Sequence, residues 1–483
     1  NNDSMMAKNK NQYDNFLIET LEENKFKVSA ELCELLVIEF KITNDNARKI
    51  VERTTKSGFI ISSAPLTFSK GQFAYFLPGE RLSKDKIKEI CKIYRPALYR
   101  LLEAIDTNNG IISYYEALKI TASPLERLNT KADYLNDLIE LLQKLDIVYQ
   151  KTDKNAVKYI ILKVNQEQEE SLIFNHFTKM SLDAVFVKDI LEWFLKSNIL
   201  DNSKIIFRNK NNPSIGATQN NLLWDAFGYT KTTGINPASA KEAKTFEKQT
   251  LVVFDVVISR DYEHFDLDGF LSRIQINLNS VNTGKRKILP IVVYKNCSTY
   301  VLNSIKSLGF LCYDIGSIYG SNIFSILENI SKLQINQSLL ENNDFEKIIE
   351  NTLDTIKNSG QEDQLKALKG TLFEVMMYQI LKHQYPNADI KASFYYSKKT
   401  LNQEDNSEIK EGYEYDYIIK SSNPKEIIVV ELKGYHSKYQ IPLGDYQTKN
   451  TVKWFFNKTL PFIKEKFKTD IVDGYTFKGA YIT

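Results

Sequence analysis

The chain contains 483 residues, of which 43% are apolar and 25% are charged, and its formal net charge is +3. This length predicts about three or four domains, each able to bury its own core. The small net charge excludes a broad attraction to nucleic acid, so any such binding requires local patches. The four cysteines lack metal-binding spacing, and no apolar run is long enough to span a bilayer. These features predict a reduced, cytoplasmic protein without a membrane segment.

Residues 1–80 are predicted to form a first domain of two helices and a hairpin. The helices are expected at 29–40 and from a cap at Thr43 or Asn44 to about residue 56, and the strands at 59–63 and 72–77. This order resembles a winged-helix DNA-binding domain. The second helix and the turn of the hairpin carry basic residues suited to phosphate contact, although a solvated helix face is the alternative. These residues are Arg48, Lys49, Arg53, Lys56 and Lys70.

Residues 81–165 are predicted to form a second winged-helix-like domain. A long amphipathic helix from 82 to 105 should break or turn near Pro96, and Ser113 should cap a short helix. A longer helix is expected at 130–145, followed by a second wing. Modules of this kind bind either duplex DNA or other proteins, and both alternatives stay open.

Residues 166–335 show alternating helical and strand patterns, which predict an α/β domain. Two of its apolar strands, at 222–229 and 251–259, carry the carboxylates Asp225 and Asp255. A polar, partly helical linker is expected at 336–360, before a last domain at 361–483.

The last domain contains an apolar strand that ends with Glu431, Leu432 and Lys433. Burying either charge without a partner costs several kcal/mol, so two opposite charges on one strand face suggest a metal site. A preceding strand at 413–419 should form a hairpin with it and bring Asp416 close to Glu431. Two carboxylates and the main-chain carbonyl of Leu432 suit a hard cation such as Mg²⁺.

A helix expected at 365–384 places Glu374 on an apolar face. The order of a helix Glu, a strand Asp and Glu-x-Lys resembles the PD-(D/E)XK nuclease superfamily, which has the restriction-endonuclease-like fold. The resemblance implies that Asp416 and Glu431 bind the metal and that Glu374 binds it directly or through water. It also implies that Lys433 activates the attacking water.

Several positions depart from the family pattern or add to it. Tyr415 stands where the family often has proline, and Glu414 is an alternative to Asp416 because alternate strand positions share a face. A helix expected at 446–466 would present Gln447 and Lys449 as accessory polar residues, unless they simply belong to its surface.

The middle domain is similar in element order to the same nuclease fold. Asp225 and Asp255 would take the strand carboxylate positions, but Val257 stands where the lysine would be and cannot activate water. We therefore expect an inactive copy kept for binding or assembly. An unrelated α/β domain is the alternative.

The sequence as a whole predicts a multidomain α/β and α+β chain. It would have winged-helix-like N-terminal domains, a degenerate nuclease-like α/β domain and a C-terminal restriction-endonuclease-like αβα domain. The implied function is a Mg²⁺-dependent DNA endonuclease, with Mn²⁺ able to substitute, in restriction or antiviral defence. Cutting both strands of duplex DNA would require a homodimer, a partner subunit or two successive nicks. The alternatives are a non-catalytic DNA-binding or assembly protein and a nuclease acting on RNA or single strands.

Overall fold

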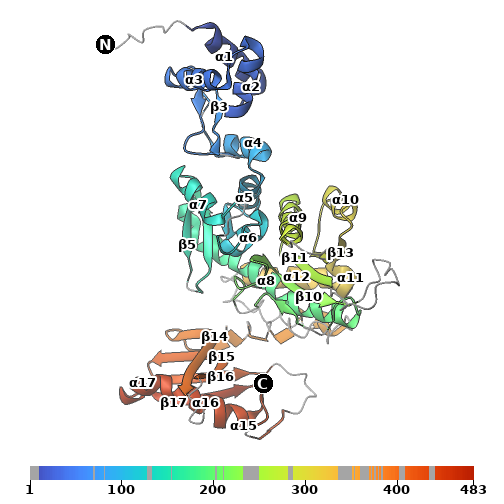
Figure 1. The fold of residues 1–483 in the computed structure, drawn as a ribbon. Helices are drawn as coiled ribbons and strands as arrows, with labels where there is room; N and C mark the ends of the chain where they lie inside the picture. The colour runs from blue at the N-terminus through green and yellow to red at the C-terminus, as the bar shows by residue number, and fades with distance from the viewer. Residues whose placement is uncertain are drawn as a thin grey trace. The chain divides into compact units, whose positions relative to one another are not determined.

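The computed structural model has a mixed α/β architecture with several small sheets, as expected at this coarse level (Figure 1). Contacts divide it into a first unit, Asn1–Ala184 with Ser197–Asp314, and a second unit, Val185–Lys196 with Ile315–Thr483. No helix in the described part of the chain combines the length and apolar character needed to cross a bilayer. The structure describes residues 10–483 except 69–70, 81, 128–132, 154, 202–203, 210–211, 232–249, 281–286, 336–350, 353, 359–368, 371–372, 375–376, 379, 382–383, 402–407, 434–440 and 446.

The first module of the first unit contains three helices and a small sheet of order β1-β3-β2. The bounds of α2 and α3 match the expected ranges, and the Thr43 hydroxyl accepts a hydrogen bond from the Asn46 amide at 3.4 Å. Two further elements, α1 and β1, were not predicted from the sequence. The elements are α1 (Gln12–Asn24), β1 (Lys27–Val28), α2 (Ser29–Phe40), α3 (Asn44–Lys56), β2 (Ile61–Ser62) and β3 (Ala74–Phe76).

The second module repeats this connectivity, since its sheet has the order β4-β6-β5. The expected long helix breaks at Arg95 before Pro96, and the Ser113 hydroxyl caps α6 by accepting from the Glu116 amide at 3.1 Å. The elements are α4 (Lys84–Tyr94), α5 (Pro96–Thr107), β4 (Ile111–Ser113), α6 (Tyr114–Thr121), α7 (Leu135–Lys144), β5 (Val148–Thr152) and β6 (Lys158–Leu162).

The α/β part of the first unit is built on a five-stranded sheet of order β13-β12-β11-β10-β7. Strands β11, β12 and β13 run parallel to one another, β10 pairs antiparallel with β11, and β7 pairs antiparallel with β10. The expected strand at 222–229 is two strands with Asp225 between them. The elements are β7 (Ile206–Phe207), β8 (Ala217–Gln219), β9 (Leu222–Trp224), β10 (Ala226–Thr230), β11 (Thr250–Val257), α9 (His264–Asn279), β12 (Ile288–Tyr294), α10 (Thr299–Ser307) and β13 (Leu311–Asp314).

Helix α9 of the α/β part packs directly on α6 of the second module (Figure 1). A Cβ atom at Gly269 would lie 2.7 Å from the Ile120 carbonyl oxygen and 2.8 Å from its Cα, closer than such contacts occur. The Arg100 side chain caps the same end of α6 by donating to the carbonyls of Ile120 and Thr121 at 2.7 and 3.2 Å. Glycine is therefore needed at position 269 for α9 to pack this closely on α6.

Helix α8 (Glu169–Lys196) contributes residues to both units. In the second unit it is joined by α11 (Ile315–Tyr319) and α12 (Asn322–Ile335), and Phe186 of α8 contacts the ring of Tyr319 at 5.9 Å between centroids.

The second unit also contains a four-stranded sheet of order β14-β15-β16-β17, drawn orange to red in Figure 1. Met377 and Leu381 pack on one face, and Phe455, Ile463 and Phe467 pack on the other. The aromatic strand β14 was not predicted from the sequence. The elements are β14 (Asp389–Leu401), β15 (Glu408–Ser422), β16 (Lys425–Leu432), α15 (Val452–Trp454), α16 (Leu460–Lys464), α17 (Lys468–Val472) and β17 (Thr476–Ile482).

Candidate active site

The β15–β16 hairpin places two carboxylates at the same end of the sheet. The ladder between the two strands ends with the pair of Tyr417 and Val430, and Asp416 and Glu431 are the next residues of the two strands. At this point the Leu432 amide donates to the Asp416 side chain at 2.6 Å. This bond holds the Asp416 carboxylate against the end of β16, whereas the Glu414 side chain is exposed.

Glu431 and Lys433 form an ion pair at 2.5 Å, and their side chains are only 16% and 20% exposed. Burial raises the pKa of the Glu431 carboxyl, and the charge of Asp416 raises it further, while the Lys433 ammonium lowers it. The Lys433 amide donates to the Ile482 carbonyl at 2.9 Å, so β17 fixes the backbone of this lysine. The site therefore holds a crowded pair of acids beside one ammonium.

Glu374 contacts this part of the sheet through Tyr417. Its main-chain carbonyl accepts a hydrogen bond from the Tyr417 hydroxyl at 2.7 Å. The pKa of Tyr417 is raised chiefly by burial and then by the charges of Glu374 and Asp416. The structure thus brings Asp416, Glu431 and Lys433 together, whereas Glu374 is connected to them through Tyr417.

The donor chemistry of this site fits a hard divalent cation. Asp416, Glu431 and the Leu432 carbonyl offer oxygen ligands, and Mg²⁺ usually keeps several waters besides one or two carboxylates. Within the described residues, no group of three or more His, Cys, Asp and Glu side chains is arranged to hold a metal ion.

The predicted start of the helix at 446–466 was wrong, because the helix begins at Val452 in the structure. The Asp445 carboxylate accepts from the amides of Gln447 and Thr448 at 2.9 and 2.7 Å, which folds this stretch into a turn. Gln447 and Lys449 are therefore exposed loop residues. Lys449 nevertheless lines a cavity together with Glu431.

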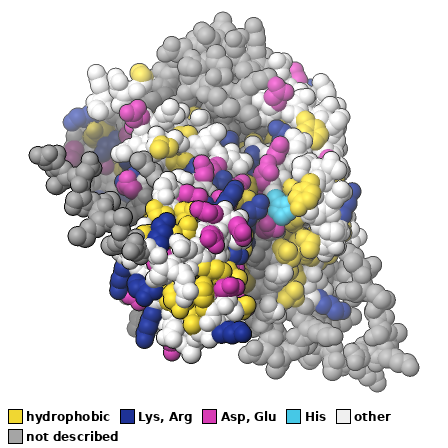
Figure 2. Space-filling view, turned by 90° about the horizontal axis from the view of Figure 1, so that it is seen from above, with side chains coloured by type: hydrophobic (Ala, Val, Ile, Leu, Met, Phe, Trp, Pro, Cys, Tyr) yellow, Lys and Arg dark blue, Asp and Glu magenta, His cyan; other side chains and the backbone are white. Residues whose placement is uncertain are grey.

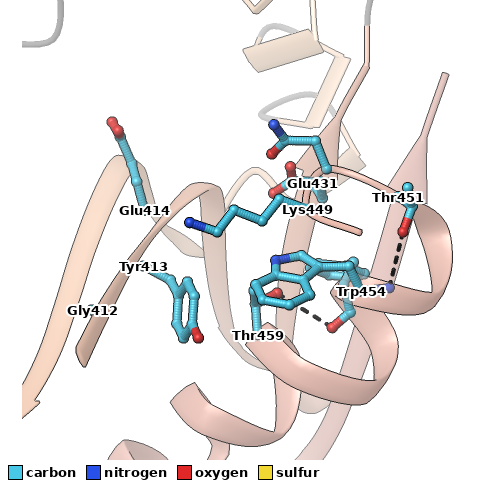
Figure 3. Close-up of a pocket in the computed structure, with 10 residues that line it drawn as sticks. Gly412, Tyr413, Glu414, Glu431, Lys449, Thr451, Trp454 and Thr459 are labelled. Carbon is cyan, nitrogen blue, oxygen red and sulfur yellow. Dashed lines mark hydrogen bonds between the residues drawn. The ribbon is translucent and has the colours of Figure 1, made fainter. Parts of the chain in front are cut away.

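This cavity has a volume of about 270 Å³ and opens beside the candidate site (Figure 3). The adjacent aromatic residues Trp454 and Phe455 follow the acidic strand motif in the sequence and could have indicated this cavity. No role was predicted for them. The lining residues are Gly412, Tyr413, Glu414, Glu431, Lys449, Asn450, Thr451, Trp454, Phe455 and Thr459.

The predicted DNA-contact residues of the first module are exposed along α3. Arg48, Lys49 and Arg53 reach solvent, and Lys56 does so while pairing with Glu52 at 2.5 Å. Lys70 lies outside the described residues.

The exposed side of the corresponding helix in the second module, α7, differs in charge from α3. It carries the acidic residues Asp137 and Glu140, and Lys144 pairs with Glu140 at 2.8 Å. The local basic excess therefore belongs to the first module.

Asp225 and Asp255 of the α/β part are almost completely buried, and their charges are balanced from within the protein. The ammonium of Lys119, on α6, lies 2.5 Å from Asp225 and 3.0 Å from Asp255. Arg273 donates to Asp255 at 2.8 Å. Tyr115 donates to Asp225 at 2.6 Å. A lysine side chain thus stands where two facing carboxylates would otherwise attract a cation.

Acid should destabilise this network. Burial alone would raise the pKa of Asp255, but the charges of Lys119 and Arg273 lower it to about 2. His176 likewise lowers the pKa of buried Glu116 against the effect of burial. Both acids therefore stabilise the fold above their ordinary pKa values of 3.8 and 4.5, and this contribution is lost as pH falls below them.

We expect the urea midpoint to fall between about pH 5 and about pH 2.5, with Asp255 contributing on the order of 2 kcal/mol. Asp183 acts in the opposite sense, because burial raises its pKa. Asp255→Asn should make the pH dependence shallower. An unchanged midpoint across this range would show that these acids are not ion-paired in solution.

Comparisons with protein-family models, with curated proteins and with solved structures found no match.

Proposed function

We propose that the chain is a Mg²⁺-dependent DNA endonuclease of the PD-(D/E)XK type, with its active site at the end of strands β15 and β16. The observation that carries this proposal is the placement of Asp416 beside the Glu431–Lys433 ion pair. Buried like charges beside a lysine are costly to keep for stability alone and are typical of catalytic sites.

In this proposal, Asp416, Glu431 and the Leu432 carbonyl hold Mg²⁺, or Mn²⁺ in its place, and Glu374 supports the site directly or through water. When bound, the cation would lower the pKa of a coordinated water and offset charge on the phosphate. Lys433 would orient this water for attack at phosphorus. The bond from phosphorus to the 3′ oxygen then breaks and leaves 5′-phosphate and 3′-hydroxyl ends, as the resemblance implies.

The remaining parts are proposed to hold duplex DNA. Both N-terminal modules would have the winged-helix fold, and the first would contact phosphates through α3. On the face seen in Figure 2, acidic and basic side chains are interspersed. A local basic helix surface is therefore a better candidate for DNA binding than a broad positive electrostatic field. The α/β part would be a nuclease-like domain without catalysis, because Lys119 neutralises its two carboxylates.

Removing charges from α3 should weaken DNA binding and its dependence on salt. For Arg48→Ala, Lys49→Ala and Arg53→Ala combined, the slope of log affinity against log salt should fall by up to about 3, near 0.9 per lost phosphate contact. The matched control removes Arg127, Lys144 and Lys158 from the second module. Equal slopes for the two triple variants, measured by fluorescence anisotropy, would contradict this assignment.

The activity itself is tested with a panel of substrates. The full chain is incubated with plasmid, linear duplex, single-stranded DNA and RNA, with Mg²⁺ or with EDTA. We expect Mg²⁺-dependent DNA cleavage that leaves ligatable 5′-phosphate ends. Cleavage of RNA alone would instead support an RNA nuclease. Absence of both cleavage and metal binding would support a scaffold protein.

A role in restriction or antiviral defence is proposed by analogy, because this combination of parts is common in such systems. One catalytic centre cuts one strand. A double-strand break would therefore need a second copy of the chain, a partner subunit or two successive nicks.

A further inference from the structure

The cavity beside Glu431 has two aromatic rings in its wall. The rings of Tyr413 and Trp454 lie 6.1 Å apart between centroids, at an interplanar angle of 79°. Figure 3 shows both rings below the extended side chain of Lys449, with Glu414 on one side and Glu431 behind. A flat molecule could stack on one ring and meet the other with its edge.

The size of the cavity limits what can enter. Its volume of about 270 Å³ lies just below the range of roughly 300–1,000 Å³ typical of drug-sized ligands. One planar ring system fits such a space, whereas a base pair does not. Glu414, Lys449 and Asn450 add polar groups that can meet the hydrogen-bonding edge of a nucleobase.

The cavity shares Glu431 with the candidate metal site. A base bound there would therefore belong to a nucleotide next to the phosphate being cut. We propose that this cavity receives one unpaired base of the scissile DNA strand, an inference that rests on the proposed function. Fully paired duplex must first unstack that base at a cost of a few kcal/mol, and mismatched or single-stranded DNA pays least. The preferred substrate is therefore DNA with an unpaired base at the cleavage position.

The test measures binding first, in EDTA, so that no strand is cut. Three DNA probes of one sequence carry 2-aminopurine at the same position, either paired, mismatched or single-stranded. The full chain should bind the mismatched and single-stranded probes about 5- to 150-fold more tightly than the paired one, the range expected for stacking one base. Trp454→Ala should remove this preference and the accompanying change in 2-aminopurine fluorescence.

The matched control is Phe456→Ala. Phe456 lies on the same helical segment and is 40% exposed, but it does not line the cavity. This variant should keep the preference. Equal affinity of the unmodified chain for all three probes would overturn the inference, as would an unchanged preference in a folded Trp454→Ala variant.

Cleavage of the same probes with Mg²⁺ separates this inference from the proposed function. A binding preference without cleavage would defeat the nuclease proposal and leave the base pocket standing. Equal cleavage of all three probes would defeat the base pocket and leave the nuclease.

Discussion

Lys433→Ala should lower kcat for Mg²⁺-dependent DNA cleavage by about 10²- to 10⁴-fold, the range usual for loss of a group that assists proton transfer. The structure gives the reason, since the Lys433 ammonium lies 2.5 Å from Glu431 beside Asp416. Without it, nothing in the described part of the site is expected to replace its role toward the attacking water. Single-turnover cleavage of a labelled DNA strand measures the chemical step directly.

The same sheet offers a matched control for Lys433. Lys478 on β17 pairs with Glu426 on β16, also at 2.5 Å, but at the opposite end of the strand. Lys478→Ala removes an ion pair of the same length, with a more exposed lysine, without touching the candidate site, so its cleavage rate should stay within a few-fold of the unmodified chain. Equal rates for both variants would mean that Lys433 is not part of the chemistry.

Lys119→Ala should lower the free energy of unfolding of the first unit by about 3–5 kcal/mol, as expected when one partner of a buried ion pair is removed. Its side chain is 8% exposed, and it pairs with two aspartates that are at most 1% exposed. This loss would measure the free-energy cost of leaving two buried carboxylates without Lys119, rather than the net contribution of the ion pairs to stability. Urea unfolding followed by tryptophan fluorescence provides the measurement.

An exposed ion pair in the same module provides the control for Lys119. Lys144 and Glu140 are 61% and 63% exposed, and such pairs contribute about 0–1 kcal/mol. Lys144→Ala should therefore change the unfolding midpoint little. If Lys119→Ala behaved in the same way, the buried network would not exist in solution.

Local signals predicted several helices and strands well. The bounds of α2 and α3 followed from the apolar spacing and the cap at Thr43. Strand β14 was missed because its lysines and serines interrupt the aromatic pattern, and pairing with β15 decides its structure.

One part of the candidate site, the approach of Asp416 to Glu431, could be predicted from the sequence. The length of the turn between two strands determines which residues of a hairpin lie opposite each other. The turn after β15 fixes the register, and the register sets Asp416 near Glu431. The start of α15 could not be read in the same way. Asn450 has φ of 62°, and Thr451 caps the helix, so side-chain hydrogen bonds rather than apolar spacing determine where it begins.

Sequence patterns could not predict which residue forms the ion pairs with Asp225 and Asp255. Lys119 lies 106 positions before Asp225. The positions of Asp225 and Asp255 on their strands suggested the remnant of a metal site. No local sequence pattern connects them to Lys119 on the short helix α6. Only the close crossing of α9 over α6 at Gly269 reveals the connection.

That crossing bears on how such chains can diverge. Recombination between two related genes, with its breakpoint between α6 and β9, would combine Lys119 from one parent with Asp225 and Asp255 from the other. The hybrid would keep the buried ion pairs and the close helix crossing only where both parents had kept Lys119, Asp225, Asp255 and Gly269. We therefore expect these four positions to change together, or not at all, among descendants of a common ancestor.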